Sequence, residues 1–212
     1  IMAIALPIVI QNLLTNFVAM LDNVMVGKIG TDQMTGVAII NQLFFVFNLA
    51  VFGGMSGAGI FSAQYFGQNN HNGARNVFRM KLIIGIFIIA ISMCVLIILH
   101  EPLINMFLHE GGASGNIHAT FKYARDYLYI MLFSIIPFVV ANCYSTTLKE
   151  AGQTMVPMIA GLLAVIVDFV FNALLIFGLL GFPKLGVIGA AIATVMSRFV
   201  ECGYLIIYTY RH

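Results

Sequence analysis

The first polar pattern of chemical interest lies in the otherwise apolar stretch 1–27. Gln11, Thr15 and Asp22 are separated by four and seven positions, which places them on one face of a helix. Asn16 belongs to a neighbouring polar stripe. A carboxyl group at membrane depth costs about 3 kcal/mol and is a candidate functional residue by default. We interpret Asp22 as a cation-binding acid; the alternative is a charge at the membrane interface near the helix end.

The neighbouring polar side chains of this stretch have two interpretations. They can line a cavity that admits substrate, which is the role we assign as a hypothesis to Gln11, Thr15 and Asn16. They can also form hydrogen bonds between helices, which is common for amides and hydroxyls in membrane proteins.

A second carboxyl group, Asp168, precedes Asn172 by four residues in the segment AVIVDFVFNALLIFG, so both share one helix face. No basic residue lies near Asp168 in the sequence, and desolvation disfavours the charged form of an unpaired carboxyl. A buried acid of this kind suits proton coupling, whereas a carboxylate with amide and hydroxyl oxygens nearby can hold Na⁺. The alternative is a protonated aspartate that only bonds another helix.

The last apolar stretch carries Thr194, Arg198 and Glu201. Thr194 and Glu201 share a face, which makes Glu201 a further candidate for a cavity lining. Arg198 and Glu201 are three residues apart, so the simplest interpretation of both charges is an ion pair along one helix.

The composition places these residues in a membrane. Hydrophobic residues make up 61% of the chain and charged residues 8%, and the mean hydropathy is +1.00; charged residues normally supply about 25% of a soluble domain. The apolar runs are too long for a membrane barrel and lack its strict alternation, so we predict an all-α, polytopic membrane protein. A hydrocarbon core of about 30 Å requires about 20 apolar helical residues. The stretches that meet this requirement are 1–27, 36–66, 80–99, 120–147, 156–179 and 187–209.

Basic residues near the ends of the stretches predict the orientation. The connections expected to be cytoplasmic follow the second and fourth stretches and the last one, where Arg75, Arg79, Lys81, Lys149 and Arg211 lie. Both ends of the chain are then cytoplasmic, in a protein of the plasma membrane. Because the sequence begins and stops close to apolar stretches, we expect it to be one lobe of a larger protein.

Several function classes are excluded by what the sequence lacks. It contains no nucleotide-binding loop, zinc-binding HExxH or GxSxG motif, so neither an enzyme nor an ATP-driven pump is expected, and no cofactor. Cys94, Cys143 and Cys202 lack ligand-like spacing and are expected in the core. No basic patch is present to bind nucleic acid.

Two backbone features bear on helix packing. Gly53 and Gly57 form a small-xxx-small pair, which predicts close approach of a neighbouring helix. Pro7 removes one backbone hydrogen bond of its helix and is a candidate bend on the helix that carries Asp22.

Five short motifs occur in order at the corresponding stretches. They are ALPIVIQNLL with MLDNVMVGKIG in the first, GGMSGAGIFSAQYFGQ in the second, LKEAGQTMVPM before the fifth, DFVFNALLIFG in the fifth, and LGVIGAAIATVMS in the sixth. In this order they resemble the MATE (multidrug and toxic compound extrusion) family, specifically its N-terminal six-helix lobe. The resemblance covers essentially the whole chain and implies one lobe of a twelve-helix transporter whose C-terminal lobe is absent here.

The resemblance implies a cation-coupling site formed by Asp22, Asp168, Asn172 and Thr194, with Na⁺ as the possible metal ion. Many relatives have Asn at the position of Asp168, and several have Asp at the position of Asn172. The acid is thus shifted by one helical turn along the same face, and both H⁺ and Na⁺ remain open as the coupling ion.

The expected activity is secondary active efflux of apolar or cationic drugs in exchange for H⁺ or Na⁺. The expected partners are these small molecules, the lipid bilayer and the second lobe. A lipid-linked oligosaccharide flippase of the same superfamily is the alternative and would be indicated by a cavity lined with several arginines. Arg198 is the one arginine expected inside the membrane, because Arg125 lies at the start of its stretch. A channel is a further alternative, which would require a continuous polar pore.

Overall fold

The computed structural model describes residues 2–110, 116–178, 181 and 183–211. The helices in this part of the chain are α1 Met2–Gly27, α2 Thr31–Gly67, α3 His71–Ile98, α4 His100–Glu110, α5 Ile117–Glu150, α6 Met155–Phe177 and α7 Val187–Arg211. All except α4 are long and apolar enough to cross a membrane, which gives six candidate spans. The predicted all-α membrane fold with six spanning helices is confirmed.

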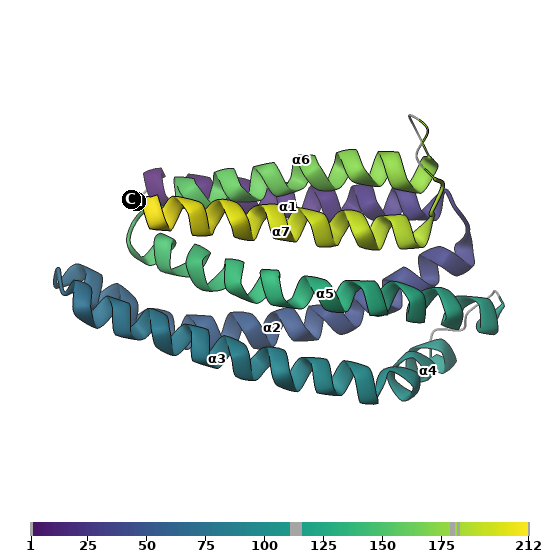
Figure 1. The fold of residues 1–212 in the computed structure, drawn as a ribbon, viewed down its shortest axis with the longest axis horizontal. Helices are drawn as coiled ribbons and strands as arrows, with labels where there is room; N and C mark the ends of the chain where they lie inside the picture. Colours follow the sequence, from purple (N-terminus) through teal and green to yellow (C-terminus); the bar gives the residue numbers. More distant parts are fainter. Residues whose placement is uncertain (1, 111–115, 179–180, 182, 212) are drawn as a thin grey trace.

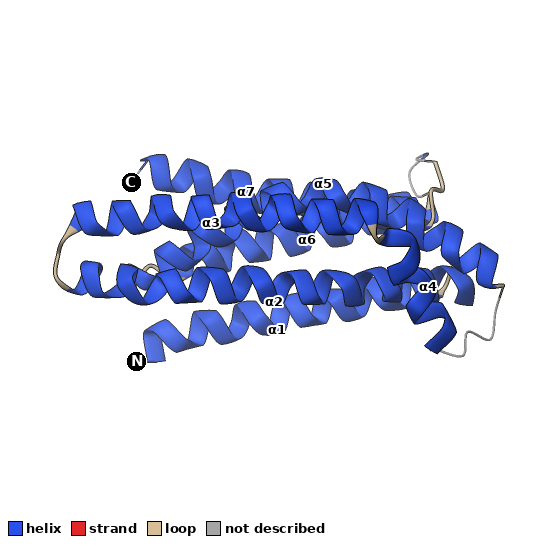
Figure 2. Ribbon diagram, turned by 90° about the horizontal axis from the view of Figure 1, so that it is seen from below, coloured by secondary structure: helices blue, strands red, loops and turns tan. Residues whose placement is uncertain are grey.

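The helices form an elongated bundle of two groups joined by α5 (Figure 1). Helices α1, α6 and α7 lie together on one side, α2 and α3 lie on the other, and α5 contacts α2, α3 and α7. Figure 2 shows the two chain ends and the α2–α3 connection at one end of the bundle. The short helix α4 lies near the opposite end (Figures 1 and 2).

Asparagine caps explain why α3 begins well before its predicted apolar stretch, and why α5 begins slightly before its own. The Asn70 side chain accepts a hydrogen bond from the backbone N–H of Gly73 at 3.0 Å and starts α3 at His71. The Asn116 side chain accepts from the N–H groups of His118 and Ala119, which starts α5. Such caps satisfy backbone donors that a helix start leaves open. Hydropathy detects only the apolar part of a helix, so these polar first turns were missed.

The connection between the third and fourth predicted stretches contains helix α4, which the sequence analysis did not anticipate. Its segment, HEPLINMFLHE, is too short and too polar to count as a span. Ile104 and Leu108 lie one turn apart and are both buried in the main core. These two side chains hold α4 against the end of the bundle.

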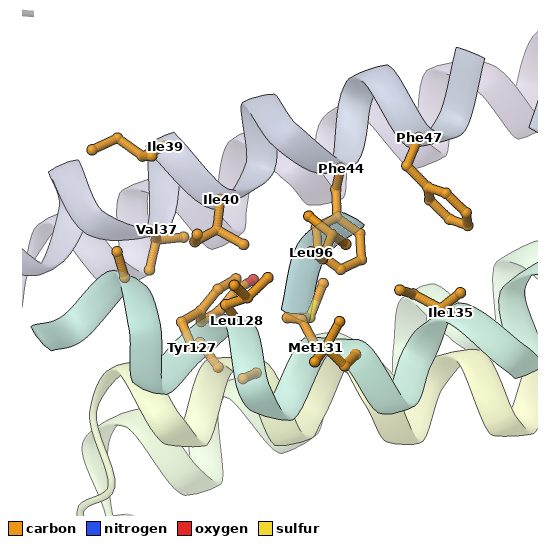
Figure 3. Close-up of a cluster of buried hydrophobic side chains, with 14 of the residues drawn as sticks. Val37, Ile39, Ile40, Phe44, Phe47, Leu96, Tyr127, Leu128, Met131 and Ile135 are labelled. Carbon is orange, nitrogen blue, oxygen red and sulfur yellow. The ribbon is translucent and has the colours of Figure 1, made fainter. Parts of the chain in front are cut away.

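The main hydrophobic core lies between α2 and α5 (Figure 3). Val37, Ile40 and Phe44 of α2 face Leu128 and Met131 of α5 in the close-up, at helical spacing. The burial is close to complete, because Ile40 and Leu128 have no exposed surface. This packing fixes the helix pair on which the larger cavity described below is built.

Glycines allow close helix contact, but not at the pair that the sequence suggested. A Cβ at Gly53 or Gly57 would meet nothing within 4 Å, so the predicted packing role of this pair is wrong for the described part of the lobe. A Cβ at Gly189 of α7 would instead lie 2.7 Å from the carbonyl oxygen of Leu175 on α6. The spacing rule recognises small residues but not which face of the helix is covered.

A buried ion pair ties α3 to the end of α5. The Lys81 ammonium has no exposed surface and lies 2.6 Å from the Glu150 carboxylate, with the hydroxyls of Thr146 and Thr147 also in reach. A Cβ at Gly59 of α2 would collide with this carboxylate, so the glycine makes room for it. The sequence analysis counted Lys81 as a connection charge that orients the chain. That assignment is wrong, because Lys81 lies within α3 and is neutralised inside the protein.

We predict that Lys81→Met will destabilise the folded lobe by about 3–5 kcal/mol, because it leaves the Glu150 charge buried without its partner. The double substitution Lys81→Met with Glu150→Leu removes both charges and should recover most of that loss. Thermal unfolding in detergent measures both variants. Equal destabilisation by the single and double variants would contradict the ion-pair explanation.

We also predict that Gly189→Ala will lower the stability by about 1–3 kcal/mol, because its methyl group must push α6 and α7 apart. Gly53→Ala is the matched control, since its methyl group enters open space and alanine favours the helix by up to about 1 kcal/mol. The same unfolding assay compares the two. The packing assignment fails if Gly53→Ala is the more damaging change.

Candidate cation and substrate site

The predicted acids of α1 and α6 meet at one amide group. The side-chain nitrogen of Asn172 donates hydrogen bonds to Asp22 Oδ1 at 2.6 Å and to Asp168 Oδ2 at 3.1 Å. Asn172 and Asp168 lie one turn apart on α6, and Asp22 approaches them from α1. An amide NH₂ has two protons, so one asparagine serves both carboxyl groups. The structure thus brings together three of the four residues proposed to couple a cation.

The α6 side of this site is shielded from solvent, whereas Asp22 of α1 is half-buried. Asp168 is 4% exposed and Asn172 is fully buried. Asp168 Oδ1 and Asn172 Oδ1 accept no hydrogen bond from the described residues. Two acids held against one donor, with unpartnered oxygens beside them, form an electron-rich pocket. Mutual repulsion and desolvation disfavour two free charges there, so such a pocket favours uptake of a proton or a small cation.

The fourth candidate, Thr194 of α7, lines the same cavity of about 120 Å³ as both acids. Its hydroxyl donates to the backbone carbonyl of Ala190 at 3.1 Å, and the hydroxyl of the neighbouring Ser197 donates to the carbonyl of Thr194. Both hydroxyl protons are therefore committed to the helix backbone. The hydroxyl oxygens remain available as acceptors, which is the character that a cation ligand needs.

The remaining predicted polar residues divide between helix contact and cavity lining. Gln11 donates a hydrogen bond from its side chain to the carbonyl of Pro157 at 3.3 Å, which joins α1 to α6, and it also lines the smaller cavity. Thr15 lines both cavities, and Asn16 lines only the larger one. Glu201 lines the smaller cavity and forms the predicted ion pair with Arg198, with Oε2 3.0 Å from Nη1.

A larger cavity of about 390 Å³ adjoins Asp22 and extends between α1, α2, α5 and α7. It shares Thr15, Asp22, Thr194 and Arg198 with the smaller cavity. Five aromatic residues line it, and the sequence analysis assigned none of them to a cavity: Phe44, Phe45, Phe47, Tyr127 and Phe138. The run Gln42–Phe47 is rich in aromatics, but its composition does not reveal which rings turn inward.

No group of three or more histidine, cysteine or acidic side chains suited to a metal ion occurs in the described part of the chain. The atoms near the Asp22–Asp168 pair that could bind a metal ion are oxygens of carboxyl, amide and hydroxyl groups. Hard oxygen ligands of this kind suit Na⁺ and not a thiolate- or imidazole-bound transition metal.

We predict that Asn172→Leu will destabilise the protein by about 3 kcal/mol, because the buried Asp168 and the half-buried Asp22 both lose their shared donor. Asn12→Leu, at an exposed position of α1, is the matched control and should leave the stability nearly unchanged. Thermal unfolding in detergent compares them. If the two variants unfold alike, the amide does not hold the acids together.

Comparison with known proteins identifies the family of this chain. The family model described as MatE matches residues 7–174. The "Probable multidrug resistance protein NorM" of Thermotoga maritima is 32% identical over 202 residues, which is 95% of this chain and 42% of that protein. The "Probable multidrug resistance protein YoeA" of Bacillus subtilis is 27% identical over 206 residues, again 95% of this chain and 42% of the relative. The chain therefore spans less than half the length of these curated relatives.

A solved structure described as "Outward-facing conformation of a multidrug resistance MATE family transporter of the MOP superfamily" has the same fold. The TM-score is 0.79 at 22% identity, and the match covers 98% of this chain and 44% of that one. The six spanning helices thus correspond to one lobe of such a transporter. The family is one of multi-pass membrane transporters and not of enzymes. The resemblance expected from the motifs is confirmed, and this chain belongs to the MatE family.

Proposed function

We propose that this lobe forms part of a secondary active exporter of apolar and cationic drugs, driven by exchange for H⁺ or Na⁺ at the Asp22–Asp168 pair. The observation that carries the proposal is the single Asn172 amide held between two acids from different helices. This arrangement links a binding event at the acids to the relative position of α1 and α6.

The charge state of the pair sets the contact between these helices. With a proton on one acid, the two carboxyl groups share the amide donor and α1 stays against α6. With both acids charged, their repulsion favours separation of the helices or entry of a cation. For Na⁺, a half-turn of the Asn172 amide presents its oxygen to the ion in place of its nitrogen. Cation binding and helix position are then coupled, as exchange requires.

The adjoining cavity connects this switch to a substrate. Asp22 lines both the small and the large cavity, so a cationic drug in the large cavity and a coupling ion in the small one compete for the same carboxyl group. Competition for one charge prevents both from being bound at once. That exclusion is the minimum requirement for antiport.

The remaining parts of the proposal concern the membrane. We place the lobe in the plasma membrane with both chain ends cytoplasmic, because Arg75 and Arg79 lie in the first turns of α3 and Arg211 ends α7. Figure 2 shows the α2–α3 connection and the chain ends at the same end of the bundle. A second six-helix lobe completes the transporter.

We predict that Asp22→Asn in the full-length protein will lower drug efflux driven by a cation gradient about tenfold or more, because the shared acid is lost. Asp126→Asn is the control, since Asp126 pairs with Arg125 outside both cavities and should transport normally. Efflux of a fluorescent dye from proteoliposomes, with pH and Na⁺ gradients imposed separately, identifies the ion. Unchanged coupling in Asp22→Asn would contradict the role of the pair.

A further inference from the structure

The smaller cavity extends from the acid pair toward one end of the bundle. It lies between α1, α6 and α7, and on each helix its lining reaches from a residue of the proposed coupling site to one nearer that end. The shortest of these separations is seven residues, or about 10 Å of helix. Helices α1 and α6 begin at this end and α7 finishes there (Figures 1 and 2). The three pairs of residues are Asp22 with Gln11, Asp168 with Gly161, and Thr194 with Glu201.

Oxygen atoms that accept hydrogen bonds line the cavity along this length. The Gln11 side-chain nitrogen donates to the carbonyl of Pro157, while its oxygen Oε1 is buried without a hydrogen-bond partner among the described residues. The hydroxyl protons of Thr15 and Ser197 are used in bonds to carbonyls of their own helices, at 2.9 and 2.8 Å. The hydroxyl oxygens therefore remain as acceptors. Oxygens of this kind replace the water shell of a monovalent cation.

A carboxylate lies at the far end of this lining. The Glu201 side chain keeps 13% of its surface exposed, and its Oε2 accepts a hydrogen bond from Arg198 Nη1 at 3.0 Å. Glu201 also interacts electrostatically with Lys149, the second-last residue of α5. Its carboxylate is thus fixed by neighbours of opposite charge, between the acid pair and the end of the bundle.

The smaller cavity excludes a drug by its size and its lining. Gln11, Ser197 and Glu201 line it and do not line the larger cavity, while the five aromatic residues of the larger cavity are absent from its lining. Its volume of about 120 Å³ has room for about four water molecules of about 30 Å³ each. Drug-sized ligands occupy pockets of about 300–1,000 Å³. The two cavities meet at Asp22, which lines both.

Building on the proposed function, we infer that the coupling cation moves between the Asp22–Asp168 pair and the cytoplasmic end of the lobe through the smaller cavity, on a path that the drug does not share. Glu201 attracts the cation at the cytoplasmic end, and Gln11 and Ser197 supply oxygens on the way to the acids. A drug bound at Asp22 blocks transfer of the cation between the two cavities. Ion movement across the lobe therefore waits for the departure of the drug. Gln11 and Glu201 belong to the ion path and not to the substrate cavity.

The first test separates drug binding from ion movement in the full-length protein. Glu201→Gln keeps a hydrogen-bond partner for Arg198 and removes the negative charge from the ion path. We expect the variant to bind a fluorescent cationic dye in detergent with wild-type affinity. Dye efflux from proteoliposomes driven by a cation gradient should be slower by about tenfold, the loss that one contact to a charged group produces. Gln11→Leu should show the same split between binding and efflux.

Asn12→Leu, an exposed position of α1 outside both cavities, is the matched control for Gln11→Leu and should leave binding and efflux unchanged. Equal losses of dye affinity and efflux in Glu201→Gln would place the residue in the drug site and overturn the inference. Wild-type efflux in both path variants would overturn it as well. In either case the export proposal stands, whereas wild-type protein without gradient-driven efflux would contradict export itself.

The second test locates the path with a thiol. Ser197→Cys, in a full-length protein whose other cysteines are replaced by alanine, places a thiol in the smaller cavity; Ser145→Cys, buried in α5 outside both cavities, is the matched control. Ag⁺ is a monovalent cation that binds thiolates. Added in nitrate buffer on the cytoplasmic side, it should stop dye efflux by Ser197→Cys equally fast with and without saturating dye, and leave Ser145→Cys active. Protection by the dye would contradict the inference, because Ag⁺ would then enter through the larger cavity. Equal inactivation of the control would contradict it too.

Discussion

One amide group sets the relation between two helices of this lobe. Asn172 donates from a single nitrogen to an acid on its own helix and to another on α1, in a place nearly closed to water. Every other feature of the site depends on that junction. The small cavity lies beside this junction, and Asp22 lines both the small and the large cavity. Helix α7 contributes Thr194 and Arg198 to the walls of both cavities. Because the acids share one donor, a change in their charge is a change in how α1 and α6 fit together.

The sequence was most informative where polar residues interrupt apolar helices. Asp22, Asp168 and Asn172 were identified because buried polar groups in a membrane need partners, and helical spacing predicted that the α6 pair share a face. The structure brings them within hydrogen-bonding distance. Spacing along α7 likewise predicted the pair of Arg198 with Glu201. These successes share one cause: local periodicity places side chains on a helix face, and the cost of an unpaired polar group in lipid turns that face inward.

Contacts between helices far apart in sequence were not predictable in the same way. Lys81 was assigned to a connection because it follows a polar turn, yet its partner Glu150 lies 69 residues later. Gly53 and Gly57 had the right spacing for packing, while the close approach occurs at Gly189. In each case the outcome depends on which helix packs against which face of its neighbour. The composition and periodicity of a single sequence do not reveal that pairing. The aromatic wall of the large cavity was missed for the same reason.

The ion pair of Lys81 with Glu150 has a consequence for how the chain enters the membrane. Helix α3 is synthesised before α5, so the ammonium meets the bilayer before its carboxylate exists. An unpaired lysine within a span costs about 3 kcal/mol on insertion scales, and a lysine side chain relieves that cost by extending to the headgroups. Lys81 lies ten residues after the start of α3, close enough to that end for such an extension. The buried contact itself needs both partners, so it forms only after the chain has been made as far as Glu150, 69 residues beyond Lys81.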